Sequence, residues 1–258
     1  MTQYYYRRLD ADRFEPSDIV RSNWDPAIQH GSPPMALLSK AAVDLLGDSP
    51  MRVGRLTLDI LGPIPVAPVQ VRSRIERPGR RISLLVAEMT LPGDDRALAR
   101  VTAWALATSD TSDVAADRFA PLVEGPARPL PPDWYGQTGF LGSVQWRPQP
   151  DDASGARVFW LSPQGRLIDG EDTTALEKLA LAVDCVNGVG ATLDFKRFTH
   201  MNTDTVLHMH RLPVGGDFAI RSLASIGPDG IGANSAEIFD RSGFIATCAQ
   251  TVFVQRIG

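Results

Sequence analysis

The sequence predicts an α+β fold of two repeats, each a helix followed by an antiparallel meander, whose strands join into one continuous sheet. Two segments place apolar residues at helical spacing, and each precedes four stretches in which apolar and polar residues alternate. A segment rich in Ala, Pro and Asp separates these two patterns. We therefore expect an N-terminal repeat at 1–111, a linker at 112–135 and a C-terminal repeat at 136–258.

The first repeat opens with an aromatic and charged stretch, Tyr4 to Phe14, that suits a strand. A helix is predicted from Pro33 to Leu46, because Ser32 is a good cap and Pro33 fits a first turn, where its missing N–H is no loss. Gly47 is placed to close this helix. The four strands of the meander are then expected at 55–61, 69–75, 82–89 and 98–106.

The second repeat begins with two short strands, expected at 142–147 and 157–161, before a helix at 174–188. Thr174 and Glu177 form a capping-box pattern, and Asn187 and Gly188 tolerate the left-handed turn that closes a helix. Asp184 lies one step off the apolar face, as either an ordinary boundary residue or a half-buried acid facing a cleft. Four more strands are expected at 205–211, 218–224, 232–239 and 244–254.

Neither a lone helix nor a lone meander covers its own apolar face, so each sheet must curl around its helix. Two such units paired edge to edge give the hot-dog architecture, doubled within one chain.

Composition excludes several classes of protein. The net charge is −4 and the basic residues are spread along the chain, which lacks the basic footprint of a nucleic-acid binder. Cys185 and Cys248 lack metal or disulfide spacing and suit a reducing compartment. We expect a cytoplasmic protein without a membrane span, because no signal-peptide pattern or apolar run of about 20 residues is present. The absence of GxSxG, Walker A and GxGxxG motifs argues against a serine hydrolase of the α/β type and a nucleotide enzyme.

Seven short stretches, in this order and spacing, resemble the thioesterase II-like family of acyl-CoA thioesterases, which has a double hot-dog fold. They are QHGSPPMALL at 29–38, RLTLDILGPIP at 55–65, PGRR at 78–81, AVDC at 182–185, NTDTVLHMHRLP at 202–213, DRSG at 240–243 and ATCAQTV at 246–252. The resemblance implies hydrolysis of a fatty acyl-CoA to free acid and CoA.

The resemblance also implies a catalytic site. In the family an Asp late in the second helix, a Thr at the start of the next strand and a Gln in the final strand orient a water. Asp184 matches the family Asp and Gln250 matches the family Gln, whereas Asn202 stands in place of the Thr, with Thr203 one residue off. A thioester carbonyl needs only a positioned water, a base and oxyanion donors, so neither cofactor nor metal is expected.

For substrate binding, the resemblance points to His30 and Gly31 at the helix entry and to Arg80 and Arg81 in a turn, the arginines through the phosphates of CoA. Solvated turn charges are the alternative for the arginines. The expected partner is acyl-CoA, with no nucleic acid, and the family's habit of further assembly suggests homo-oligomers. Aligning the two helices by their expected caps, Ser32 on Thr174, places Ala42 where Asp184 would be.

Other interpretations stay open. The missing Thr suggests a non-catalytic acyl-CoA-binding protein, and Gln250 alone would suit a strand amide satisfied by backbone. Asp25 and His30, five positions apart, have the separation used by hot-dog enoyl-CoA hydratases. The cluster His200, His208 and His210 suggests a metal site, but no further motif completes a ligand set and none is predicted. 

Overall fold

The computed structural model describes residues 3–130 and 138–257. The first half contains one long helix and six strands: β1 (Tyr4–Arg8), β2 (Arg13–Pro16), α1 (Ser32–Asp44), β3 (Met51–Ile60), β4 (Val69–Arg77), β5 (Ile82–Thr90) and β6 (Ala99–Ala107), with a 3-10 turn at Asp18–Val20. The predicted meander after the first helix is therefore confirmed.

The second half contains three helices and eight strands among its described residues. They are α2 (Gly139–Gly142), β7 (Val144–Pro148), β8 (Arg157–Pro163), β9 (Arg166–Ile168), α3 (Ala175–Val183), α4 (Val186–Gly190), β10 (Phe198–Asn202), β11 (Asp204–Met209), β12 (Phe218–Ile226), β13 (Ile231–Asp240) and β14 (Gly243–Arg256). The four strands predicted after the second helix are present as β11 to β14. The sequence patterns missed α2, β9 and β10, each of which has five or fewer residues.

All of these strands belong to one sheet of 14 strands, in the order β7-β8-β12-β13-β14-β11-β3-β6-β5-β4-β2-β1-β9, with β10 paired to β14. The two halves join where β11 pairs antiparallel with β3, so that Leu207 lies opposite Leu56. The predicted continuous sheet of a double hot-dog is therefore confirmed.

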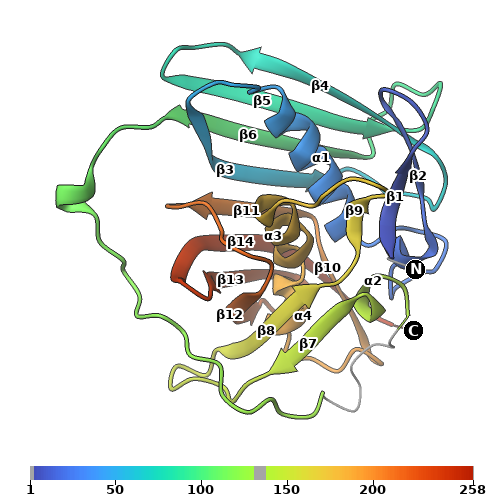
Figure 1. The fold of residues 1–258 in the computed structure, drawn as a ribbon. Helices are drawn as coiled ribbons and strands as arrows, with labels where there is room; N and C mark the ends of the chain where they lie inside the picture. The colour runs from blue at the N-terminus through green and yellow to red at the C-terminus, as the bar shows by residue number, and fades with distance from the viewer. Residues whose placement is uncertain (1–2, 131–137, 258) are drawn as a thin grey trace.

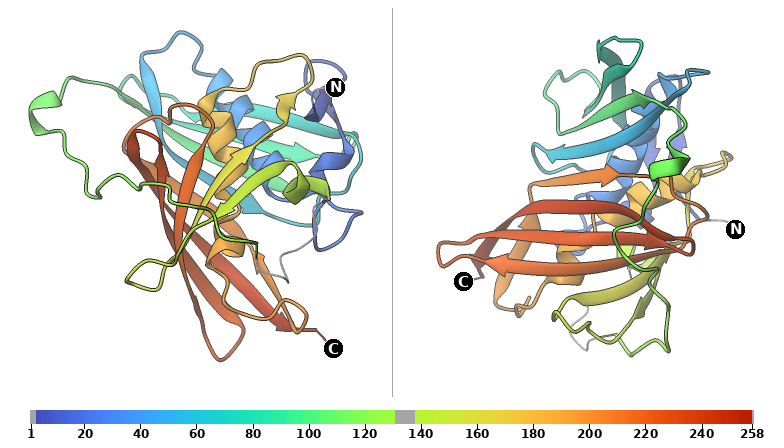
Figure 2. Two further views of the ribbon diagram at one scale, coloured as in Figure 1. Left: turned by 60° about the horizontal axis from the view of Figure 1, so that its bottom comes forward. Right: turned by 90° about the vertical axis from the view of Figure 1, so that its left-hand side faces the viewer.

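The sheet curls so far that its two ends approach one another around the helices (Figure 1). β8 lies near one end of the strand order and β9 at the other, yet Gln164 and Gly165 alone separate them in the chain. β9 pairs parallel with β1, which fastens the second half onto the far edge of the first. The other views show the same curl, with both long helices on the concave side (Figure 2).

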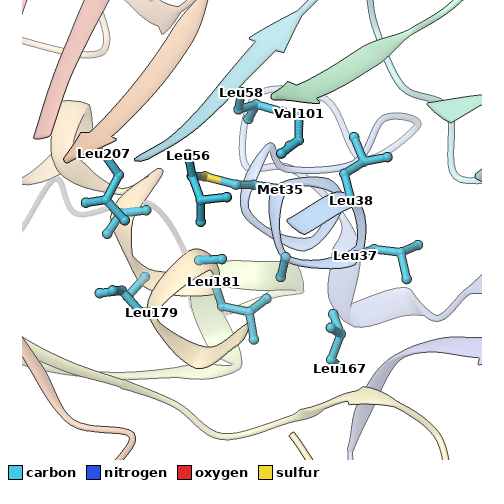
Figure 3. Packing of buried hydrophobic residues seen from close by; sticks show 14 of the residues in the cluster. Met35, Leu37, Leu38, Leu56, Leu58, Val101, Leu167, Leu179, Leu181 and Leu207 are labelled. Atoms are coloured by element: carbon cyan, nitrogen blue, oxygen red, sulfur yellow. The ribbon is translucent and has the colours of Figure 1, made fainter. Parts of the chain in front are cut away.

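One core joins both helices to the sheet. Leu37 and Leu38 of α1, Leu181 of α3, and Leu56 and Leu207 of the central strands are fully or almost fully buried in the same cluster (Figure 3). Burying a leucine side chain stabilises the fold by roughly 1.5–3 kcal/mol, so these contacts hold α1 and α3 side by side and fix how their ends meet.

The ends of both helices differ from the predictions. The N-cap of α1 is Gly31 and not Ser32, and no side chain caps it. The second helix breaks after Val183, with Asp184 as its C-cap, and α4 begins at Val186. Gly188 lies inside α4 without a left-handed conformation. The capping box is as predicted, with Glu177 N–H donating to Thr174 Oγ1 at 3.2 Å and Thr174 N–H to Glu177 Oε2 at 3.0 Å. Gly47 also adopts the left-handed conformation expected after α1, with a φ of 48°.

The segment between β6 and β7 crosses the outer face of the second half. Within its described part, up to residue 130, it contains a 3-10 turn at Ser112–Val114 and no strand. Phe119 lies edge-on to Phe244 at a centroid distance of 4.9 Å, and Leu122 packs against the same cluster. Residues 131–135 of the expected linker lie outside the described residues.

Candidate active site

A cavity of about 380 Å³ lies where the N-terminus of α1 meets the C-terminal end of α3. The last residue of β3 and the loop that follows it form one wall, and β10 contributes another. The lining residues are Ser22, Trp24, Ile28, Gln29, His30, Gly31, Ile60, Leu61, Gly62, Pro63, Ile64, Asp184, Asn187, Met201, Asn202, Thr203 and Phe253.

Asp184 is the acidic residue in this lining, and its side chain is 2% exposed. The Oδ1 atom accepts two hydrogen bonds, from Asn202 Nδ2 at 2.8 Å and from Thr205 Oγ1 at 2.9 Å. A buried carboxylate needs such donors to remain ionised. Because both bind Oδ1, the other oxygen is left for a partner from the cavity.

Gly31 lies directly against the second oxygen of this carboxylate. A Cβ atom placed on Gly31 would be 2.6 Å from Asp184 Oδ2, a distance that no side chain tolerates. The Gly31 backbone has an ordinary φ of −65°, so the close approach, and not its backbone conformation, requires glycine here. The absence of a side chain brings the start of α1 within reach of the acid.

His30 lies beside the same oxygen and is neutral. Its Nδ1 is 3.5 Å from Asp184 Oδ2 and accepts a hydrogen bond from Ser32 N–H at 3.1 Å. Burial lowers the pKa of His30, while the charge of Asp184 partly opposes that shift. With Nδ1 acting as an acceptor, the neutral ring carries its proton on Nε2. The ring stacks on Phe140 at 4.4 Å, which holds its orientation.

Gln250 and Thr205 form the buried support of the acid. Gln250 Nε2 donates to Thr205 Oγ1 at 2.9 Å and to the backbone oxygen of Asp184 at 3.2 Å. Neither residue lines the cavity within the described part of the chain. Of the predicted site residues, Asp184, Asn202, Gln250, His30 and Gly31 are thus brought together, but Gln250 lies in the support and not at the surface of the cavity.

The structure does not bring Thr203 into this cluster. Its side chain is exposed, and its hydroxyl donates to Asp204 Oδ1 and lies near the backbone oxygen of Thr251. Thr203 reaches the rim of the cavity but makes no hydrogen bond with Asp184. The structure therefore places Thr203 at the rim of the cavity, while Asn202 is the residue that donates to Asp184.

Arg80 and Arg81 also lie away from the cavity. The backbone oxygen of Arg81 accepts from Ala107 N–H, and Ala107 pairs with Met51 at the start of β3. The cavity is at the other end of β3, at Ile60. Ten strand residues at about 3.3 Å each separate the two ends by roughly 30 Å, so the structure does not bring these arginines together with Asp184.

The structure separates the residues of the two alternative arrangements, the hydratase pair and the histidine cluster. Asp25 is on an exposed turn, where its carboxylate accepts from Ala27 N–H, and it does not line the cavity with His30. His200 is buried, whereas His208 and His210 are more exposed on the strand that follows. Among residues 3–130 and 138–257, no group of three or more His, Cys, Asp or Glu residues has the geometry of a metal site.

Thr205 was not identified from the sequence, although Thr205 and Asn202 both donate a hydrogen bond to Asp184 Oδ1. Asn202 lies opposite Val252, and Val206 lies opposite Ala249, so β10 and β11 advance four residues while β14 advances three. This one-residue bulge at Thr203 changes which face the later residues present. Strict alternation would put Asn202 and Thr205 on opposite faces, and no signal in the sequence marks the bulge.

Comparison with known families agrees with this architecture. Residues 20–106 match the model of the acyl-CoA thioesterase N-terminal domain, and residues 116–254 match that of the C-terminal domain. The chain belongs to the acyl-CoA thioesterase family. Its activity is therefore that of a thioester hydrolase, as the resemblance implied. No curated protein matches this thioesterase.

Solved structures share the fold of the thioesterase at low sequence identity. A conserved protein of unknown function with a hot dog fold from Alicyclobacillus acidocaldarius has a TM-score of 0.73 at 14% identity, covering 97% of this chain and 96% of the other. The acyl-CoA thioesterase II TesB2 from Mycobacterium marinum has a TM-score of 0.68 at 14% identity, covering 98% and 96%. In the described part of the thioesterase, no helix has the length and apolar character needed to cross a membrane.

Proposed function

We propose that this thioesterase hydrolyses acyl-CoA by direct attack of a water molecule, with Asp184 as the general base. The observation that carries this proposal is the asymmetry of the carboxylate. Oδ1 accepts from Asn202 and Thr205, whereas Oδ2 lies beside Gly31, which lines the cavity as Asp184 does. The nearest ring nitrogen, His30 Nδ1 at 3.5 Å, is itself an acceptor. Oδ2 is therefore available to take a proton from water.

In the proposed reaction, the water oxygen forms a bond to the thioester carbonyl carbon as Oδ2 takes its proton. The carbonyl oxygen becomes an oxyanion, and the Gly31 N–H at the start of α1 is its proposed donor. That N–H donates to no described residue, and a helix N-terminus favours negative charge. The oxyanion then re-forms the carbonyl as the C–S bond breaks. The CoA sulfur takes the proton held by Asp184 and leaves as the thiol.

The side chains of the cavity favour water over a covalent nucleophile. Cys185 follows Asp184 in the chain but does not line this cavity, and burial raises the pKa of its thiol well above the usual range, so the thiol stays protonated. Ser22 Oγ accepts from Trp24 N–H, and neither it nor Thr203 is hydrogen-bonded to Asp184. An activated hydroxyl would need a base within hydrogen-bond reach.

The other residues of the cluster have positioning roles in this proposal. Asn202 and Thr205 hold Oδ1, and Gln250 holds Thr205 and the end of α3. Asn202 Oδ1 in turn accepts from Asn187 Nδ2 at 3.0 Å. The replacement of the family Thr by Asn202 therefore leaves Asp184 with a side-chain donor. The neutral His30 can donate from Nε2 to the bound substrate.

The direct test is thiol release from acyl-CoA by wild type and Asp184→Asn. Loss of a general base lowers kcat by about 10²–10⁴-fold, while substrate binding should change little. Asp44→Asn is the matched control, because Asp44 is an exposed residue at the end of α1 paired with Lys40. Equal kcat in wild type and Asp184→Asn would refute the proposal. Tight acyl-CoA binding by wild type without turnover would instead indicate a binding protein.

A reducing compartment such as the cytoplasm remains our expectation. It rests on an acyl-CoA substrate and on Cys185 and Cys248, both of which are buried free thiols.

A further inference from the structure

A second, smaller chamber adjoins the substrate cavity and shares three of its lining residues, Trp24, His30 and Asn187. Its volume is about 50 Å³. By the same measure one water requires about 10–15 Å³, so the chamber accepts only a few heavy atoms. Such a chamber fits a short acyl group and excludes a long fatty chain.

His200 in β10 forms part of the chamber wall, and its side chain is buried without a partner. The residue is 1% exposed, and neither Nδ1 nor Nε2 has a hydrogen-bond partner among the described residues. Phe195 lies edge-on to its ring at 6.3 Å. A buried polar group without a partner costs stability, so an unpaired imidazole in the chamber wall indicates a ligand group that pairs with it.

The chamber selects for a neutral ligand group. None of its described lining residues carries a charged side chain, and Trp146 adds aromatic surface to that of Phe195. Burial lowers the pKa of His200 to about 4, so near neutral pH the ring offers one N–H donor and one acceptor nitrogen. A hydroxyl group can satisfy both, whereas a carboxylate or an amine would find no countercharge.

We propose that the thioesterase prefers a short acyl-CoA whose acyl chain carries a hydroxyl group, and that His200 recognises this hydroxyl. The proposal rests on the proposed function of the neighbouring Asp184. The thioester would sit at Gly31 and Asp184, with the acyl group in the small chamber. The CoA arm would leave through the larger cavity, whose lining includes the exposed residues Leu61, Met201 and Phe253.

The test compares kcat/KM for matched pairs of substrates: butanoyl-CoA with 3-hydroxybutanoyl-CoA, and pentanoyl-CoA with 4-hydroxypentanoyl-CoA, with enzyme-free blanks. For the better of the two pairs, wild type should have a kcat/KM about ten- to a hundredfold higher on the hydroxylated substrate than on the unsubstituted one. The reason is that an unsubstituted acyl group leaves the buried imidazole unpaired. His200→Phe should lose this preference and gain activity on the unsubstituted acyl group. His200→Gln, which keeps a donor and an acceptor, should retain part of the preference.

His208→Phe is the control, because His208 is exposed on β11, and it should keep the wild-type preference. Since the His200 nitrogens have no partner, His200→Phe should unfold at the same or a higher temperature. A wild type without preference for either hydroxylated substrate, or a His200→Phe enzyme that retains it, would overturn the proposal.

A binding measurement separates this proposal from the proposed chemistry. A non-hydrolysable thioether analogue of 3-hydroxybutanoyl-CoA or 4-hydroxypentanoyl-CoA should shift the ring nitrogen NMR signals of His200 in the inactive Asp184→Asn protein, and the unsubstituted analogues should not. Hydrolysis that depends on Asp184, with neither a hydroxyl preference nor this shift, would refute the His200 proposal alone. A shift with equal turnover in wild type and Asp184→Asn would refute the proposed catalytic role alone.

Discussion

The helices α1 and α3 lie side by side in opposite directions, and the two junctions at which an end of one lies beside an end of the other have opposite chemistry. At the first junction, the start of α1 at Gly31 faces Asp184 at the end of α3, beside the cavity of about 380 Å³. At the second, Lys40 near the end of α1 faces Glu177 in the first turn of α3. A cavity of about 220 Å³ lies beside Lys40. No described residue of α3 lines this second cavity, whereas the larger cavity is lined by Gly31 and Asp184, the residues that cap the facing ends of both helices.

The difference lies in how each helix begins. Gly31 caps α1 without a side chain, which leaves its own N–H available and lets Asp184 approach. Thr174 and Glu177 cap α3 reciprocally, and their side chains occupy the first N–H groups. With the observed caps aligned, Ala41, and not Ala42, takes the place of Asp184. The comparison teaches that helix capping, more than the fold, decides which junction suits an oxyanion.

The largest expected effect comes from adding a side chain at Gly31, where α1 lies directly against Asp184. Gly31→Ala would put a methyl group 2.6 Å from Asp184 Oδ2, displacing the base. A misplacement of about 1 Å costs on the order of a hundredfold, so kcat should fall at least that far, as measured by thiol release.

Gly125→Ala is the control for this change, because the added Cβ would lie at an ordinary 3.4 Å from Gln149 Oε1. Its kcat should stay near that of wild type. An active Gly31→Ala enzyme would show that the close approach of α1 to the acid is not needed.

His200 is a second difference between the two junctions. It lies near the first junction and is a buried base whose nitrogens have no hydrogen-bond partner among the described residues. Its pKa is lowered from 6.5 to about 4, so the unfolded chain binds more protons between these values. The free energy of unfolding should therefore fall as the pH drops from 6.5 to 4, by about 3 kcal/mol from this residue. Urea unfolding of wild type and His200→Phe measures the contribution as the difference between the two curves, and parallel curves would contradict it.

Thr205→Val tests the support of Asp184. The substitution keeps the shape but removes the donor to Oδ1 and the acceptor for Gln250. We expect kcat to fall about tenfold, corresponding to about 1.4 kcal/mol for one buried hydrogen bond.

Thr203→Val is the matched comparison, two residues away, whose hydroxyl donates to Asp204 and not to Asp184. It should change kcat by no more than about twofold. Equal losses in the two variants would favour a general effect of altering this strand over the specific contact of Thr205.

The smallest effect is expected at the second junction. Lys40→Met removes an ion pair to Asp44 at 3.2 Å and longer ones to Glu171 and Glu177, at 3.9 and 3.8 Å. We expect a loss of up to about 1 kcal/mol in unfolding free energy, with thiol release unchanged. A large loss of kcat with normal stability would reveal a role for this junction in catalysis.

Much of the fold could be predicted, because period and capping are local properties of the sequence. The sequence pattern located both helices, the eight strands of the two meanders and the two short strands β7 and β8, and Thr174 with Glu177 formed the expected capping box. The cap of α1 was predicted wrongly, because Ser32 has the right chemistry but its N–H donates to His30. The capping preference of a residue reflects its own helix alone, and it takes no account of a second helix end nearby, here the end of α3 at Asp184.

The candidate site was predictable only in part. Asp184 and Gln250 were identified by resemblance, whereas Thr205 depends on a bulge that pairing with β14 reveals. Arg80 and Arg81 were expected near the substrate because their turn resembles a family motif. Strand direction places that turn at the far end of β3, and such long-range geometry is not contained in a short motif.

The most direct test of Asp184 as a base, and not as a nucleophile, is a single turnover in water enriched in the heavy oxygen isotope. Enzyme in excess over acyl-CoA is quenched after one turnover, and the acid and the Asp184 peptide are analysed by mass spectrometry. Direct attack by water predicts one heavy oxygen in the acid and none in Asp184. Unlabelled acid in that turnover, with heavy oxygen in the Asp184 carboxylate, would show a covalent anhydride and contradict the proposed mechanism.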